Sequence, residues 1–262
     1  YEHLEVAETI CYDGTPAHNE RRWIEGHGFR AREFRVTWES AQALIDAGVP
    51  FTLTTVLPHA AHAQAVFGYD SRRGVLLIRD PNERHFREAL AEELIERSTS
   101  TGPRGMAFVP QDDAARLDAM DLPESELYDG AYALHSALDR HDRDAAETAY
   151  RKMAEMDGGH RLTLHARASM ASYDADLSRV LRQVEQLLEM FPDDVHQWKA
   201  RLRLLRELGT RGERIELLKE LYGRAEVDPV LVQQYVEELL DDAREKRRTA
   251  YLLRRAMRAR PV

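Results

Sequence analysis

The sequence predicts an α+β domain with an antiparallel sheet, followed by an all-α array of helical hairpins. Short segments rich in β-branched and aromatic residues, separated by turn residues, occur only between Tyr1 and Pro110. From Leu127 onward these strand signals cease, and segments of helical periodicity follow one another. With a length of 262 residues, this change of pattern indicates two domains.

The first predicted domain begins with helices and continues as a strand meander. Two helical segments fill residues 1–28, and Gly28 is expected to end the second. Thr37 is expected to cap a helix that runs to Ala47, because its side chain accepts a hydrogen bond from the helix start. A charged helix is predicted over 83–97. The predicted strands are 32–36, 51–56, 63–69, 75–79 and 106–109.

An acidic stretch separates the two predicted domains. Residues 111–126 contain four Asp, two Glu and Pro123, a composition typical of a linker. We therefore expect the α+β domain over residues 1–110, a linker over 111–126 and the helical array over 127–262.

The helical part repeats at a fixed interval. Met153, Leu187 and Leu221 are equivalent positions, and each is followed by the next after about 34 residues. In this interval, and in the apolar positions of the second helix of each of four units, the array resembles the tetratricopeptide (TPR) repeat family. A generic antiparallel array of another helical repeat type is the alternative.

The first-helix signature of the TPR family is weaker. Trp198 falls on the family's tryptophan position, but Arg201-Leu202 replace the Leu-Gly pair that follows it. In either type of array, each hairpin buries its apolar face by stacking on its neighbours. We expect the repeats to hold an extended or helical segment of a protein partner.

Composition and charge argue against several other functions. The formal net charge of -9 disfavours a nucleic-acid-binding surface, and the basic residues within 244–260 are interpreted as a solvated helix face. No apolar run approaches the roughly eighteen residues that a membrane span needs. His59 and His62 stand three residues apart in a Pro-led loop, a spacing that does not indicate a metal site. No cofactor is expected.

The single cysteine, Cys11, bears on compartment and on chemistry. It excludes an internal disulfide framework and a multi-cysteine zinc site, which fits a reducing compartment, so a cytoplasmic location is expected. The chain starts at Tyr1 without a targeting signal, and we expect further residues upstream of it.

Two predicted strands bring a histidine and an aspartate together. If residues 70–72 form a three-residue loop, Tyr69 pairs with Arg73, and the same register places His62 opposite Asp80. A carboxylate beside an imidazole fixes the tautomer of the ring and stabilises its protonated form, as an acid–base catalyst requires. A hairpin whose mouth carries a structural His–Asp hydrogen bond is the alternative.

The same stretch resembles a known family of enzymes. A histidine opens an apolar strand, Gly-Tyr-Asp leads into a short turn, and a second apolar strand ends in Asp-Pro. Residues 1–109 in this way resemble the C-terminal part of the papain-like cysteine peptidases that process double-glycine bacteriocin leaders. The resemblance implies a partial papain-like fold in which His62 is the general base and Asp80 orients it.

The nucleophile of that family does not map onto this chain. The family places a glutamine and then Cys-Gly, at a helix start, ahead of the segment that begins at Tyr1. Cys11 does not fit, because Tyr12 follows it and because it lies near the end of a predicted helix, where the helix dipole disfavours a thiolate. We expect Cys11 to be a small core residue.

Two functions follow. The first is a protein-interaction protein, with a peptidase-like domain that lacks its nucleophile in this chain and a partner-binding array of repeats. The alternative is a cysteine peptidase or acyl-transfer enzyme whose catalytic cysteine lies upstream of Tyr1, with His62 as base and Asp80 as the orienting residue.

Overall fold

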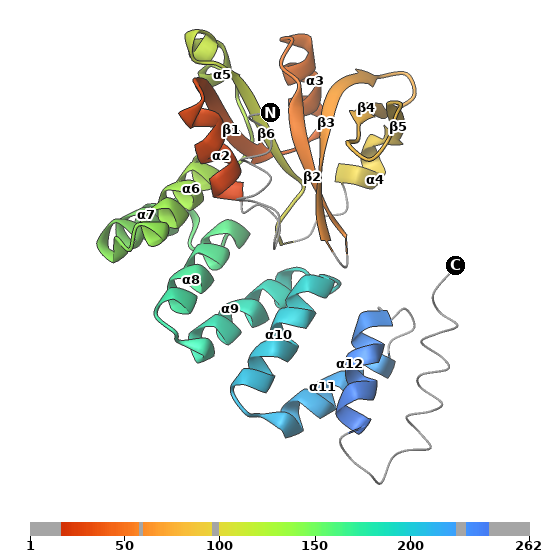
Figure 1. Cartoon of the computed structure of the whole chain (residues 1–262), viewed down its shortest axis with the longest axis vertical. Coiled ribbons are helices and arrows are strands. Elements are labelled where there is room, and N and C mark those ends of the chain that lie inside the picture. Colours follow the sequence, from red (N-terminus) through yellow and green to blue (C-terminus); the bar gives the residue numbers. More distant parts are fainter. Residues whose placement is uncertain (1–16, 58–59, 96–99, 224–228, 241–262) are drawn as a thin grey trace. The chain divides into compact units, whose positions relative to one another are not determined.

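A computed structural model describes residues 17–57, 60–95, 100–223 and 229–240 of the chain (Figure 1). The chain divides into two compact units, Tyr1–Tyr173 and Asp174–Val262, called unit 1 and unit 2 below. The expectations for Cys11 and for the basic residues within 244–260 fall outside the described residues. Within the described ranges, no helix combines the length and the apolar character needed to cross a membrane.

Unit 1 is built on one antiparallel sheet of six strands, in the order β1-β6-β2-β3-β4-β5 (Figure 1). The strands are β1 (Phe29–Arg35), β2 (Phe51–Leu57), β3 (Ala60–Asp70), β4 (Val75–Arg79), β5 (Arg87–Leu90) and β6 (Arg104–Pro110). An antiparallel α+β arrangement in the N-terminal part is thereby confirmed. Each predicted strand has a counterpart in the sheet, and β5 was not predicted.

One face of the sheet, called the core face below, carries the apolar core of unit 1. Helix α3 (Trp38–Asp46) covers this face and buries Leu44 in the core. Thr37 caps α3 as predicted, since its side chain accepts the N–H of Ser40 while the Ser40 hydroxyl oxygen accepts the N–H of Thr37. The fully buried side chains of the strands here include Phe34, Phe51, Leu53, Val66, Leu76 and Ile78.

The predicted helix over 83–97 is wrong in its first part. Residues 87–90 form β5, which pairs with β4 so that Arg87 lies opposite Ile78, and the helix α4 is confined to Ala91–Ile95 within the described residues. Charged residues with good helix propensity favoured a helix, but strand pairing overrides that preference. Alternation along β5 leaves Arg87 partly buried and Glu88 exposed.

The stretch predicted as a linker is folded against the sheet. Residues 111–126 contain the 3-10 helix η1 (Gln111–Asp113) and α5 (Ala114–Asp118), and they bury Leu117 and Leu122 in the core. These two leucines provide the apolar surface that anchors an otherwise polar segment. Unit 1 accordingly extends to Tyr173, beyond the expected domain end at residue 110.

Charged residues join the opposite face of the sheet to α2 (Ala17–Gly26) and α6 (Ser125–Asp139). Glu33 alternates with buried Phe34 along β1 and therefore points away from the core face. Arg104 Nε donates to Glu33 Oε2 at 2.7 Å, and Arg21 Nη1 lies 2.6 Å from Asp129 Oδ1 of α6. We call Arg21, Glu33, Arg104 and Asp129 the α2–α6 charge cluster.

The helical region begins in unit 1 and continues in unit 2. In unit 1, α7 (Arg143–Asp157) and α8 (Arg161–Tyr173) share a core with α6. The helices of unit 2 are α9 (Leu177–Met190), α10 (Val195–Glu207), α11 (Arg211–Gly223) and α12 (Pro229–Leu240). A helical C-terminal region is thereby confirmed.

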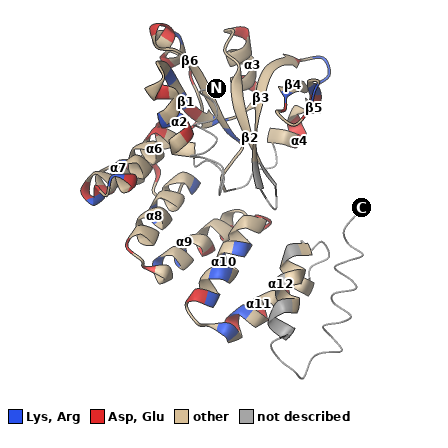
Figure 2. Cartoon of the chain, viewed as in Figure 1, with Lys and Arg blue, Asp and Glu red and all other residues tan. Residues whose placement is uncertain are grey.

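The helices keep the predicted spacing. The starts of α7, α9 and α11, at residues 143, 177 and 211, are equally spaced at the interval expected from the sequence, and so are the starts of α8, α10 and α12. Asp142 and Asp176, separated by the same interval, each accept a backbone N–H at the start of the following helix. Figure 2 shows charged residues along α7 and α10. The assignment to the TPR type stays a prediction.

Candidate functional site

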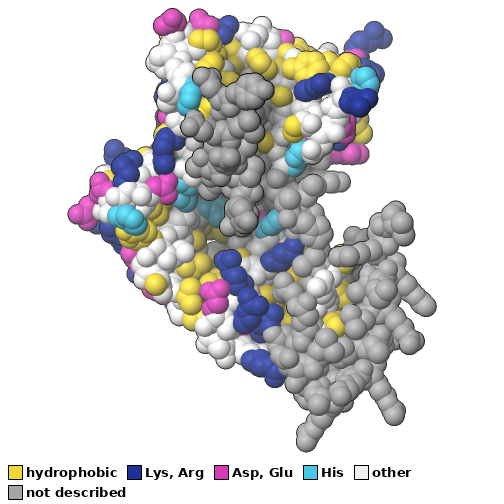
Figure 3. Space-filling view, in the orientation of Figure 1, with side chains coloured by type: hydrophobic (Ala, Val, Ile, Leu, Met, Phe, Trp, Pro, Cys, Tyr) yellow, Lys and Arg dark blue, Asp and Glu magenta, His cyan; other side chains and the backbone are white. Residues whose placement is uncertain are grey.

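His62 projects from β3 on the core face of the sheet. Gln64 and fully buried Val66 share this face, because alternate residues of a strand point to the same side. The side chain of His62 is 24% exposed, so it lies where the apolar core gives way to solvent. Histidine side chains reach the surface of the chain at several places (Figure 3). His62 has an aspartate as its hydrogen-bond partner, as His18 of α2 also does.

That partner is Asp80, which follows directly after β4 and is 7% exposed. Asp80 Oδ2 lies 2.8 Å from His62 Nε2, and Asp80 Oδ1 accepts the backbone N–H of Asn82 at 2.8 Å. The bond from Asn82, and after it the bond from His62, hold the pKa of the Asp80 carboxyl below its ordinary value of 3.8. Asp80 is therefore an anion in a fixed orientation at neutral pH.

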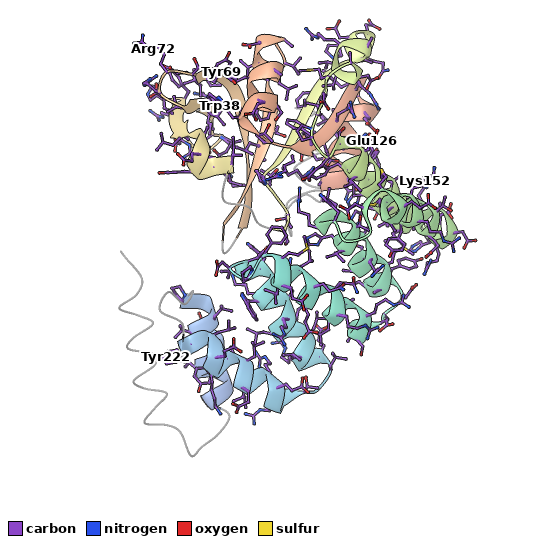
Figure 4. All side chains as sticks on the ribbon, turned by 180° about the vertical axis from the view of Figure 1, so that it is seen from behind. Trp38, Tyr69, Arg72, Glu126, Lys152 and Tyr222 are labelled. Carbon is purple, nitrogen blue, oxygen red and sulfur yellow. The ribbon has the colours of Figure 1, made fainter. Side chains whose placement is uncertain are left out.

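The hairpin between β3 and β4 differs from the predicted one at its turn. Asp70 pairs with Val75, so the loop has the four residues 71–74 and not three. Figure 4 shows Arg72 at the tip of this loop, and Tyr69 of β3 beside Trp38, with 5.8 Å between the ring centroids. The predicted pairing of Tyr69 with Arg73 is therefore wrong.

The register at the other end of the hairpin also differs. A bulge in the middle of β3 leaves Ala65 opposite Arg79, and one step further Gln64 lies opposite the position of Asp80. His62 is two residues beyond Gln64 on the same face and reaches Asp80 along the diagonal. The predicted pair is present, although not in the predicted register.

The hydrogen bond to Asp80 determines which ring nitrogen of His62 is free. A neutral imidazole that bonds a carboxylate through Nε2 carries its proton there, which leaves the lone pair on Nδ1. No hydrogen bond joins Nδ1 to a residue within the described ranges. His62 can accept a proton through Nδ1, and Asp80 can stabilise the imidazolium that forms.

Three polar residues beside the pair were missed in the sequence. Arg87 Nη2 donates to Gln64 Oε1 at 2.6 Å, and Gln64 Nε2 donates to Thr55 Oγ1 at 3.2 Å. Gln64 is 4% exposed. A glutamine at an inward position of an apolar strand was the available signal, because a buried amide needs hydrogen-bond partners.

The nucleophile is not among the described residues if it is a thiol. Cys11 is the only cysteine of the sequence and lies in residues 1–16. The hydroxyl of Thr55 donates to the backbone carbonyl of His62 at 3.2 Å and is not directed at the ring. The described part of the chain also holds no group of three or more His, Cys, Asp or Glu side chains arranged for a metal ion. The geometry therefore provides an acid–base pair, and its catalytic role stays a prediction.

Comparison with known proteins adds one match. A family model described as "Peptidase_C39 like family" matches residues 8–98, a segment that contains both His62 and Asp80. The match supports a C39-type, papain-like peptidase domain in the N-terminal part. A search of curated proteins and a search of solved structures each found no match.

Proposed function

We propose that the sheet of unit 1 carries the acid–base pair of a cysteine peptidase or related acyl-transfer site, with His62 as general base and Asp80 as the residue that orients it. The observation that carries this proposal is the 2.8 Å hydrogen bond from His62 Nε2 to an Asp80 carboxylate that a backbone N–H also holds. The family match over residues 8–98 supports it. A double-glycine leader as substrate is a narrower part of the proposal and rests on the resemblance of residues 62–81.

In the proposed reaction, His62 activates a cysteine thiol. Its Nδ1 accepts the thiol proton, the thiolate adds to the peptide carbonyl carbon, and the imidazolium gives the proton to the leaving amine as the C–N bond breaks. Water then attacks the acyl-cysteine, with His62 taking a proton from the water and returning it to the departing thiolate. Asp80 holds the ring and balances its charge in both steps.

The test is labelling of the full-length protein with a thiol-reactive peptidase probe. We expect the labelling to survive Cys11→Ser and to slow at least about 100-fold in His62→Ala, because the base is lost. Labelling that disappears in Cys11→Ser would assign the nucleophile to Cys11 instead. An absence of labelling at every pH contradicts an enzymatic function.

A separate observation favours protein binding by the helical region. The helix pairs that start at residues 143, 177 and 211 keep one constant interval, as stacked repeats do. We propose that this array holds an extended or helical segment of a protein partner, either as a platform without catalysis or as the part that captures a substrate.

Truncation after Tyr173 tests the array, because it removes unit 2 and leaves unit 1 complete. The partner to be tested is one that binds the full chain and cross-links to α10. We expect the shortened chain not to bind this partner. The shortened chain should keep the thermal unfolding transition of the sheet. Unchanged affinity for that partner contradicts the binding role of unit 2.

A further inference from the structure

Five residues around the base form a polar network across neighbouring strands. Arg87 of β5 donates to Gln64 of β3 at 2.6 Å, and Gln64 donates to Thr55 of β2 at 3.2 Å. Thr55 donates to the backbone carbonyl of His62 at 3.2 Å, and the ring of His62 bonds Asp80 at 2.8 Å. The positive charge of Arg87 also acts on Asp80, where it is a minor cause of the lowered pKa of the carboxyl.

The donors and acceptors of this network all follow one direction. The Thr55 hydroxyl has a single proton, which it gives to the carbonyl of His62, so its oxygen must accept from the amide nitrogen of Gln64. That orientation leaves the amide oxygen of Gln64 to accept from Arg87. Successive bonds polarise one another, and the cation at one end strengthens the bond at the other end.

The burial of these polar groups costs folding free energy. Gln64 is 4% exposed, and Arg87 Nε is buried without a hydrogen-bond partner among the described residues. A polar atom withdrawn from water in this way is destabilising. Arg87 lies opposite Ile78, and Ile78 precedes Asp80 by two residues, so the guanidinium and the carboxylate project on the same face of the sheet.

We propose that Arg87 and Gln64 are positioning residues for the His62–Asp80 pair. Arg87 supports the Asp80 carboxylate by its charge, and through Gln64 and Thr55 it fixes the backbone of His62. Neither residue contacts the reacting atoms. The proposal rests on the proposed function, because the group that is positioned is the base of that reaction.

The test compares Arg87→Met, which removes the charge and the donors, with Arg84→Met, which removes the same charge from an exposed loop residue. In the full chain, NMR of labelled histidine and aspartate measures solvent exchange of the His62 Nε2 proton and the titration of the Asp80 carboxyl. In Arg87→Met we expect exchange about tenfold faster, and titration of Asp80 at higher pH. Arg84→Met should match the wild type. Unchanged exchange and titration in folded Arg87→Met overturn the proposal.

Two further variants separate the two effects and replace Arg87→Met if it does not fold. Arg87→Lys keeps the charge and should restore the Asp80 titration. Gln64→Met keeps the Arg87 charge and breaks the hydrogen bonds from Arg87 to Gln64 and from Gln64 to Thr55. It should therefore accelerate exchange of the His62 proton with little change in the titration of Asp80. Unchanged exchange of the His62 proton in folded Gln64→Met refutes the positioning role of Gln64. An Asp80 titration shifted to higher pH in Arg87→Lys refutes the role of the Arg87 charge.

Probe labelling distinguishes this proposal from the proposed function. We expect Arg87→Met and Gln64→Met to slow labelling about tenfold, because the base is displaced from its productive geometry, and Arg87→Lys to recover part of the rate. If the wild type shows no labelling, the enzymatic function fails, while the NMR comparison still decides whether Arg87 and Gln64 position the pair.

Discussion

His62 and His135 both lie near an aspartate in unit 1, but their rings meet different neighbours. His62 bonds Asp80 directly and is 24% exposed. The ring of His135, on α6, stacks on that of His18, with 5.1 Å between centroids, while Asp139 bonds His18 at 3.0 Å. Burial, and after it the charge of His18, lower the pKa of His135 to about 4.

The difference shows what makes an imidazole suitable for proton transfer. A carboxylate on one ring nitrogen holds the imidazole in one orientation, whereas burial disfavours the protonated ring. His135 therefore stays neutral near pH 7 and serves the packing of α2 on α6. His62 has a fixed anion on Nε2 and a second nitrogen that is free of hydrogen bonds to the described residues.

The largest expected effect comes from removing the anion at His62. Asp80→Ala breaks the bonds to His62 and Asn82, and we expect the probe labelling rate of the full-length protein to fall about 100-fold. Asp80→Asn removes the charge and leaves one acceptor oxygen for two donors, so it should not retain the rate. Asp139→Ala, the matched change beside the other histidine pair, should leave the rate unchanged, and an equal loss there contradicts the comparison.

The next effect is on the pH dependence of stability at His135. Its folded pKa, about 4, lies below its ordinary value of 6.5, so the unfolded chain binds a proton between these pH values that the folded chain does not. The stabilising contribution is complete above pH 6.5 and is lost as the pH falls. His135→Phe removes this linkage.

Urea unfolding at pH 6.5 and pH 5 measures this pH-dependent contribution of His135 to stability. Relative to His135→Phe, the free energy of unfolding of the wild type should fall by about 2 kcal/mol over this interval. The exposed His85 offers the control, since His85→Gln should track the wild type at both pH values. A difference between the wild type and His135→Phe that is the same at both pH values contradicts the prediction.

The smallest effect is expected at the exposed ion pair beside His18. Arg22 Nη2 lies 2.7 Å from Asp139 Oδ2, and the two side chains are 45% and 40% exposed. Arg22→Met should change the free energy of unfolding by less than about 0.5 kcal/mol, because solvent screens such pairs. Arg21→Met, at the buried neighbour, should cost clearly more in the same urea titration. Equal costs would show that burial does not separate the two sites.

The His62–Asp80 pair was predictable although its register was not. The two residues stand at the outer ends of apolar strands joined by a short loop, so an antiparallel hairpin brings them to one end of the sheet. The longer loop and the bulge together displace the predicted pairing by two residues at this end. An even displacement keeps both side chains on the same face.

Other parts of the site depend on contacts that spacing does not reveal. The Arg87–Gln64 bond passes across β4, and it forms because β5 is a strand at the edge of the sheet and not the helix that its charged composition indicated. Likewise, two leucines within 111–126 decide that this acidic stretch folds onto the core. Both outcomes are set by tertiary partners that lie far along the chain.

The α2–α6 charge cluster determines where the chain can be divided. Arg21 and Glu33, 3% and 4% exposed, belong to α2 and the sheet, but Asp129 comes from α6, which begins at the end of residues 111–126. A fragment that ends in this stretch would keep the buried arginine and lose one of its counter-charges. The sheet is therefore not a separate module, and a fragment that contains the sheet must also contain α6.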